Sequence, residues 1–316
     1  MTRSADRSFA LLVLLALTSS AILMTLLGTL LPRADELFLR GSAGPADIVT
    51  VLVLLLAVGG IALGLVALFR QLIETVALIR SLLSRRIATP AAIAALALEL
   101  EIGGRVDVVR DQRPFSFCYW FLRPRICLAT GLVDRLETDE LRAVLLHERY
   151  HLRHRDPLRL VIARYFAAGL YVVPVVEELV EHYSVQKEIA ADQDAVRTVG
   201  GVRALAAALY KVLPDADDVS LGLLVPVGSL SVTEARIDQL VDGRAAPLVL
   251  SRAGVALSGG ALAAAMILAL SQASLPVALD PVTPLAALLS FVGPASLLSV
   301  AAVTGGIQQL RLVAHR

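Results

Sequence analysis

The sequence has 316 residues, of which 57% are hydrophobic and 18% are charged. The mean hydropathy of +0.73 excludes an ordinary soluble domain, and the length allows a catalytic domain together with a few membrane spans. The net charge of +1 offers no basic surface of the kind that binds nucleic acid, so we expect no direct nucleic-acid partner.

The first apolar segment, residues 9–32, carries no charge and is long enough to cross a lipid bilayer. Arg3 and Arg7 precede it, as the basic residues of a cleaved signal peptide do. The apolar run continues past the usual length of a signal core. We therefore favour an uncleaved membrane anchor.

A second expected span covers residues 47–69, which are uncharged after Asp47. Three glycines in this segment allow close packing against another helix, namely Gly59, Gly60 and Gly64. Arginines precede the first span and gather after the second, at Arg70, Arg80, Arg85 and Arg86. Because basic residues stay on the cytoplasmic side, the N-terminus and the domain after the second span are expected in the cytoplasm.

The segment after the second span combines helix and strand signals. We expect helices at 70–84 and 90–101, followed by short strands at 106–109, 115–121 and 125–128. A strand edge beside a catalytic site can hold an extended substrate by main-chain hydrogen bonds, although a purely structural sheet explains the same pattern. The two cysteines, Cys118 and Cys127, are too few for a disulfide framework, and we expect them to be reduced.

The next predicted helix carries the strongest chemical pattern of the chain. Thr138 is expected to cap a helix that continues to about His154. His147 and His151 are four residues apart, so both imidazoles can face one point, and Glu148 lies beside them. This His-Glu-x-x-His pattern binds zinc through two imidazoles and uses the glutamate as general base. A helix that carries these residue types by chance is the alternative.

A later predicted helix, residues 178–198, offers the third ligand that a catalytic zinc requires, Glu188. Asp192 lies one turn further on the same face and is expected to orient His147, because metal-bound imidazoles usually donate to a carboxylate. A solvated acidic helix face is the alternative, but the two segments together favour zinc hydrolysis. His182 is either a group that steadies a developing oxyanion or a surface histidine.

Residues 157–176 lie between the histidines and Glu188 and are apolar enough to suggest a membrane span. A single crossing would put Glu188 and His147 on opposite sides of the bilayer. Arginine is costly at the bilayer centre, and Arg159 and Arg164 lie in this segment. We therefore expect a buried, interfacial or re-entrant helix.

The C-terminal part of the sequence repeats the membrane pattern. A helix at 202–213 and a loop at 214–228 lead to two apolar runs, 253–274 and 283–303, which we read as a helical hairpin. The connection between these runs has no Lys or Arg, whereas arginines flank the pair. This asymmetry puts the connection outside and the C-terminus inside the cell.

The segment HERYHLRHRD (147–156), followed by EIAAD (188–192), resembles the membrane-embedded zinc peptidases of the M56 group. That group includes the metallopeptidase part of the BlaR/MecR antibiotic-response sensors and is close to the M48 CAAX-type and HtpX-like peptidases. The resemblance covers roughly residues 98–240. It departs at Arg149, where many zinc peptidases carry an apolar residue. Asp156 matches a polar position of the family, and Arg236 matches an arginine that either steadies the active-site region or forms a structural salt bridge.

The resemblance implies a gluzincin-type zinc metalloendopeptidase that cleaves a cytoplasmic protein, with a BlaI-type repressor as the candidate substrate. It implies that Zn²⁺ is bound by His147, His151 and Glu188 and that Glu148 is catalytic. An HtpX-like quality-control protease is the first alternative. The second is a catalytically silent membrane receptor or scaffold, which Arg149 keeps open. Whether the chain forms a homo-oligomer is also open.

Together these features predict a mainly α membrane protein with four transmembrane helices and an inserted cytoplasmic α+β peptidase domain. Residues 1–69 are expected to form the N-terminal pair of transmembrane helices, 70–246 the zinc peptidase domain and 247–316 the C-terminal pair. The lipid bilayer of the plasma membrane is therefore an expected partner, and the chain is expected to cross it several times.

Overall fold

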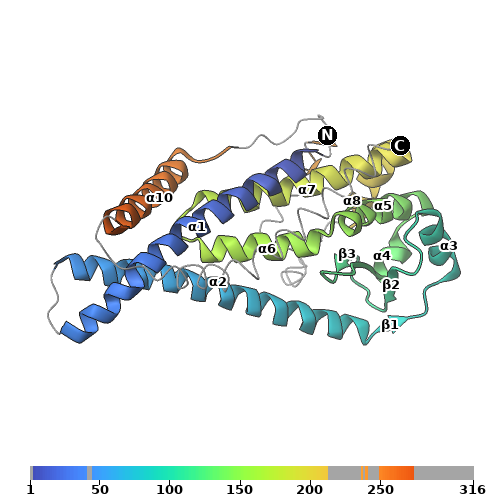
Figure 1. The fold of residues 1–316 in the computed structure, drawn as a ribbon. Coiled ribbons are helices and arrows are strands. Elements are labelled where there is room, and N and C mark those ends of the chain that lie inside the picture. The colour runs from blue at the N-terminus through green and yellow to red at the C-terminus, as the bar shows by residue number, and fades with distance from the viewer. Residues whose placement is uncertain (1–2, 41–44, 213–235, 238, 241–248, 274–316) are drawn as a thin grey trace. The chain divides into compact units, whose positions relative to one another are not determined.

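The computed structural model describes residues 3–40, 45–212, 236–237, 239–240 and 249–273. This part of the chain is mainly helical and contains one small sheet (Figure 1). The chain divides into two compact units. Unit 1 comprises Met1–Ser8, Gln71–Val161 and Glu181–Leu248, and unit 2 comprises Phe9–Arg70, Ile162–Val180 and Val249–Arg316. Unit 1 contains every residue that the sequence assigns to the metal site.

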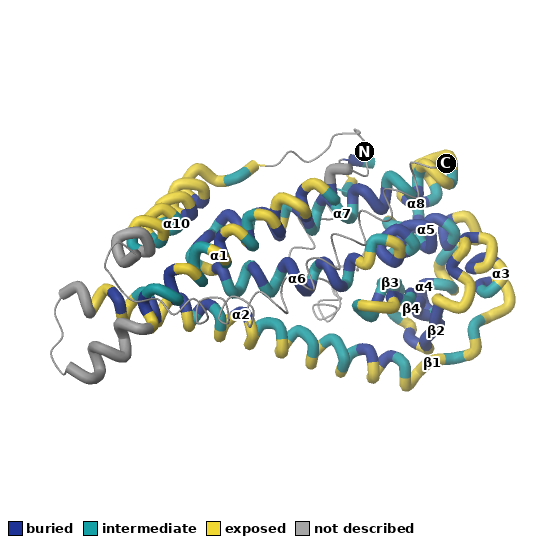
Figure 2. Tube along the Cα trace, viewed as in Figure 1, coloured by how far each residue is buried: buried dark blue, intermediate teal, exposed yellow. Residues whose placement is uncertain are grey.

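Two long helices provide the candidate membrane spans, α1 (Arg3–Arg40) and α2 (Pro45–Leu83). Their apolar parts, Ala5–Leu31 and Ile48–Leu83, are long and apolar enough to cross a membrane, by length and composition. Only 22% of the apolar window of α2 is buried, so its side chains lack the cover that a soluble core helix receives (Figure 2). The helix predicted at 70–84 is not separate, since the sequence has no glycine or proline there to end α2.

A helical hairpin replaces the single apolar helix expected at 157–176. Helix α6 (Asp156–Gly169) ends after 14 residues, and α7 (Val175–Val199) follows after a short turn. Fourteen helical residues extend about 21 Å, which is less than the hydrocarbon thickness of a bilayer of about 30 Å. Helix α7 then runs back alongside α6. The Tyr183 hydroxyl of α7 lies 3.4 Å from the carboxylate of Asp156, the first residue of α6. The hairpin therefore removes the topological conflict between His147 and Glu188.

Glycines allow the end of α6 to approach α2 closely within unit 2. A Cβ atom at Gly60 would lie 2.5 Å from the Gly169 carbonyl oxygen, and one at Gly64 would lie 3.2 Å from the Gly169 Cα. A Cβ atom at Gly59 would have no neighbour within 4 Å among the described residues. The close packing expected from the α2 glycines is thus observed at two of the three positions, with α6 as the partner.

Helix α10 (Arg252–Ala273) matches the third apolar run of the sequence. It contributes a shorter apolar stretch than α1 and α2, Arg252–Leu268. Its Ser258 hydroxyl accepts a hydrogen bond of 3.1 Å from the Val175 N–H at the start of α7. The expected loop at 214–228 and the fourth span at 283–303 lie outside the described residues.

The sheet of unit 1 has the strand order β1-β2-β4-β3, formed by β1 (Arg86–Ile87), β2 (Val106–Val109), β3 (Ser116–Tyr119) and β4 (Arg125–Ala129). β2 and β4 are parallel, and the other two pairs are antiparallel. β1 was not predicted, because two residues carry no periodic signal. Cys118 pairs with Ile126 and Cys127 with Phe117, so the two cysteines face opposite sides of the sheet and both are free, as expected.

Helices cover both faces of this sheet. On one face, Val108, Ile126 and Leu128 pack against α3 (Ala91–Glu99), α4 (Thr130–Arg135) and the long helix α5 (Thr138–His154). α8 (Arg203–Val212) adds Leu205 to the same core. On the other face, Phe115 and Cys127 pack against the C-terminal end of α2. The sheet therefore fixes α5 from one side, and α5 contacts β3 and β4 directly.

One buried carboxylate ties all four strands of this sheet together. Asp107 on β2 is fully buried, and Arg86 and Arg125 approach it to 2.7 Å and 2.5 Å. The Tyr119 hydroxyl also donates to it. Burial alone raises the pKa of Asp107, but the hydrogen bonds from Arg125 and Tyr119 outweigh burial, and the net pKa lies below its usual range.

We expect Asp107→Asn to destabilise unit 1 by about 2 kcal/mol, because it removes the charge that these three donors share. A carboxyl of depressed pKa stabilises the fold above its unfolded pKa of about 3.9, and this stability is lost as the pH falls through the folded pKa. Thermal melting of wild-type and Asp107→Asn protein in detergent measures the difference. It should be constant above about pH 5 and shrink below about pH 4. A difference that does not change with pH would contradict the assignment.

Candidate metal centre

Helix α5 is fixed at both ends. Glu137, rather than Thr138 as expected, is its N-cap, and it forms a capping box with Glu140, whose Oε2 accepts the Glu137 N–H at 2.9 Å. The negative charges of these side chains also interact favourably with the positive, N-terminal end of the helix dipole. At the other end Arg155 adopts a left-handed conformation with φ of 52°, and α6 begins at the next residue. This sharp bend places Asp156 beside the last turn of α5.

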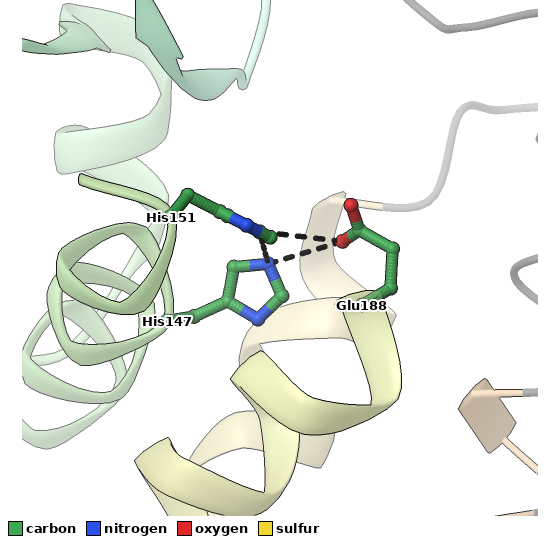
Figure 3. Close-up of side chains that lie close together, drawn as sticks. All are labelled: His147, His151 and Glu188. Atoms are coloured by element: carbon green, nitrogen blue, oxygen red, sulfur yellow. Dashed lines mark hydrogen bonds and ion pairs between the residues drawn. The ribbon is translucent and has the colours of Figure 1, made fainter. Parts of the chain in front are cut away.

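Three side chains from α5 and α7 meet at one point (Figure 3). The Nε2 atoms of His147 and His151 are 3.0 Å apart. The Oε2 atom of Glu188 lies 3.3 Å from the first nitrogen and 3.6 Å from the second. The structure therefore brings together the three ligands that the sequence predicted.

A carboxylate holds the far nitrogen of each imidazole. The Nδ1 of His147 lies 2.7 Å from Asp192 Oδ1, and the Nδ1 of His151 lies 2.6 Å from Asp156 Oδ2. A proton on each Nδ1 leaves each Nε2 as an acceptor. With both imidazoles neutral, two nitrogen acceptors and one carboxylate oxygen converge, and a cation at this point would replace the extra proton that His151 otherwise holds. The residues present thus fit a metal ion, and two imidazoles with one carboxylate suit zinc.

The electrostatics of the cluster also favour a cation. Burial lowers the pKa of His151, but the charge of Glu188 and the hydrogen bond to Asp156 outweigh burial and raise this pKa to about 10. Burial has the opposite effect on a carboxyl group and raises the pKa of Glu188. The positive charges of Lys187 and His151 outweigh burial and hold this pKa well below its usual range. The buried cluster of His147, His151 and Glu188 therefore stabilises a positive charge.

Asp192 is itself held in place by Arg236. The guanidinium donates through Nε to Oδ2 at 2.7 Å and through Nη2 to Oδ1 at 2.8 Å. Its Nη1 lies 4.0 Å from Glu188 Oε2. Asp192 has no exposed surface, so a partner for its charge is required. Arg236 thus forms a salt bridge that also borders the metal-ligand cluster.

The two oxygens of Glu148 have different surroundings. Oε1 accepts a hydrogen bond of 2.8 Å from the Ser116 hydroxyl on β3. Oε2 is buried and has no hydrogen-bond partner among the described residues. One oxygen is therefore fixed to the sheet while the other is available to a water molecule. Ser116 was not predicted, because nothing in the sequence relates a strand residue to a glutamate on a later helix.

We expect Ser116→Ala to lower kcat by roughly 10-fold or more and to leave the metal content unchanged, because the change frees Glu148 without touching a ligand. Peptidase assays and metal analysis of the purified variant measure both quantities. Ser116→Thr keeps the hydroxyl and should retain most of the activity. An unchanged kcat in Ser116→Ala would exclude this positioning role.

Two other residues singled out in the sequence lie apart from the cluster. Arg149 turns towards the Leu100 carbonyl, at 3.5 Å from Nη1, and towards Asp194, at 3.9 Å from Nη2. His182 has no described contact with the ligand residues, and burial lowers its pKa. The departure from the usual motif at Arg149 therefore leaves the ligand geometry intact.

The first turn of α1 packs behind the third ligand. Ala5 forms a small buried cluster with Tyr150 of α5 and with Ala190 and Ala191 of α7. Asp6 pairs with Arg159 at 2.6 Å between Oδ1 and Nη1. The two alanines lie between Glu188 and Asp192 in the sequence, so this contact supports the segment that carries both carboxylates.

Comparisons with known proteins relate the chain to peptidases. Residues 41–238, more than half of the chain, match the family model described as BlaR1 peptidase M56. Protease HtpX homolog 1 of Streptomyces coelicolor is 32% identical over 123 residues, which cover 28% of this chain and 40% of that protein. Protease HtpX homolog 2 of Methanosarcina mazei is 36% identical over 72 residues, which cover 22% of this chain and 24% of that protein. The chain thus spans less than half the length of either relative.

Proposed function

The chain belongs to the BlaR1 peptidase M56 family, and from this membership we propose that it is a zinc metalloendopeptidase that cleaves a cytoplasmic protein. The observation that carries the proposal is the convergence of two imidazole Nε2 atoms and one Glu188 oxygen, with a carboxylate behind each imidazole. The two relatives are also named as proteases.

His147, His151 and Glu188 would hold the zinc, which polarises a carbonyl and lowers the pKa of a bound water to about 7. Glu148 Oε2 would accept a proton from the attacking water and pass it to the leaving nitrogen. Ser116 keeps Glu148 in place by holding its other oxygen. Asp192 and Asp156 keep both imidazoles in the tautomer that leaves Nε2 free.

The substrate segment would lie along β3. Among the described strands β3 pairs only with β4, so its second edge can accept an extended peptide. Ser116 on this strand contacts Glu148, which relates the strand edge to the general base. A peptide added to the sheet here would present a carbonyl to the metal site.

For the membrane arrangement we infer four transmembrane helices, with the zinc peptidase domain inserted between two pairs on the cytoplasmic side of the plasma membrane. The arginine distribution supports this orientation. The two apolar helices at Ala5–Leu31 and Ile48–Leu83 support the N-terminal pair. Accessibility of cysteines introduced into the connection at 275–282 should place it outside the cell; labelling only from the cytoplasm would overturn this topology.

For the substrate, a BlaI-type repressor and damaged membrane proteins are the two candidates. Both come from the resemblance of residues 147–156 and 188–192 to M56 and HtpX-like peptidases, since the family description and the relatives' names give a peptidase or protease and no substrate. Cleavage of a co-expressed repressor at one site would favour the signalling role. Cleavage of many membrane proteins with the repressor left intact would favour quality control.

We expect the purified wild-type protein to contain about one zinc ion per chain, because the three ligands converge on one point. Metal analysis after dialysis measures this content. Protein that folds but holds no zinc would instead favour a catalytically silent receptor or scaffold, and the peptidase proposal would then fail.

A further inference from the structure

Lys187 contacts one of the two carboxylate oxygens of Glu188, and the other oxygen faces the two histidines. Its Nζ lies 2.5 Å from Glu188 Oε1. The other oxygen, Oε2, is the one that faces both imidazoles, at 3.3 Å and 3.6 Å. The carboxylate therefore enters the ligand cluster with one oxygen, while the lysine holds the second.

Lys187 is one of few lysines in the chain, and its side chain is largely buried. The chain has two lysines, Lys187 and Lys211, and all its other Lys-or-Arg positions are arginine. The Lys187 side chain is 12% exposed, and a buried ammonium group is unfavourable unless it is paired. Glu188, Asp156 and Glu148 all act on it electrostatically. Lys187 therefore belongs to the polar network of the site and not to the solvated surface.

The coordination chemistry of carboxylates gives this contact a consequence. A carboxylate can bind a metal through one oxygen or through both. Catalytic zinc has three protein ligands and keeps a further position open for water. A second oxygen from Glu188 would compete for that position, which the water beside Glu148 needs.

We propose that Lys187 is a positioning residue that keeps Glu188 a one-oxygen ligand and so preserves the open position for the reacting water. The inference rests on the proposed peptidase function. By sharing the charge of Glu188, the ammonium group also weakens this ligand as a donor. Partners of metal ligands of this kind usually change metal affinity or activity by 10- to 100-fold.

Cobalt substitution of the purified full-length protein tests the proposal without relying on activity. Four-coordinate cobalt absorbs visible light more strongly than five- or six-coordinate cobalt, so the spectrum reports how Glu188 binds. We expect Lys187→Met to bind cobalt with a visible spectrum that differs from the wild-type spectrum in band position or intensity, and Lys187→Arg, which keeps the positive charge, to restore much of the wild-type spectrum. Lys211→Met is the matched control. The Lys211 Nζ lies 2.7 Å from Glu140 Oε2, and Glu140 is not one of the three converging ligands.

Activity on labelled casein gives a second readout. We expect kcat of Lys187→Met to fall about 10- to 100-fold with little change in KM. A Lys187→Met protein with the wild-type spectrum and kcat would overturn the proposal, as would Lys187→Arg behaving like Lys187→Met. If Lys187→Met does not fold, Lys187→Gln replaces it under the same criteria. A wild-type protein that binds neither zinc nor cobalt would instead refute the peptidase proposal itself.

Discussion

Replacing Glu148 with glutamine is expected to lower peptide hydrolysis by about 100- to 10,000-fold while the protein keeps its zinc. Glutamine has the shape of glutamate and can still accept the Ser116 hydrogen bond, but it cannot take a proton from water. Glu148 is not one of the three converging ligands, so metal binding should survive. Cleavage assays and metal analysis on the same preparation measure both quantities.

The matched control for this variant is Glu101→Gln. Glu101 is a surface carboxylate that pairs with Arg153 at 2.7 Å and has no role in the cluster. Its substitution should leave both activity and zinc unchanged. Undiminished cleavage by Glu148→Gln would refute the assignment of Glu148 as general base, whatever the metal content.

Replacing His147 with alanine is expected to reduce zinc affinity by more than about 100-fold, since changes to the partners of ligands alone cost 10- to 100-fold. The variant also leaves the buried Asp192 facing only Arg236, so some stability is lost as well. Zinc titration and thermal melting of the purified variant measure these two effects. Activity should fall in proportion to the zinc that is lost.

His154→Ala provides the control for this variant. His154 lies on the same helix, but its ring stacks on Tyr150 with centroids 3.9 Å apart, and its Nδ1 contacts the Tyr150 carbonyl at 2.8 Å. It should keep full zinc affinity. Equal loss of zinc in both variants would mean that the helix, and not the ligand, had been damaged.

The sequence predicted the elements whose signals are local. The strand at 106–109 has the expected bounds, because β-branched residues define it, and the helix at 138–154 ends as expected but begins one residue earlier, since Glu137 and not Thr138 caps it. Residues 157–176 were harder, since apolar content alone does not distinguish one long helix from two with a turn between them. Their pairing across the turn depends on contacts far apart in sequence.

In the candidate metal site, too, the sequence predicted the features with local signals and not those that depend on distant contacts. His147 and His151 follow from helical spacing, and the placement of Asp192 beside His147 agrees with the need of a ligand imidazole for a carboxylate. The same need predicts a second carboxylate for His151, and it could have identified Asp156, which the sequence marked only by resemblance. The contacts of Ser116 and Lys187 depend on side-chain directions that no spacing rule gives.

Helix α1 belongs to both compact units, since its first turn lies in unit 1 and the rest in unit 2. A helix that crosses a bilayer changes its tilt when the hydrocarbon layer becomes thicker or thinner. Tilting α1 would press Ala5 against the alanines behind Glu188 or withdraw it from them. For α1 as one of the proposed transmembrane helices, we therefore expect the turnover of the reconstituted protein to depend on the acyl-chain length of the surrounding lipid.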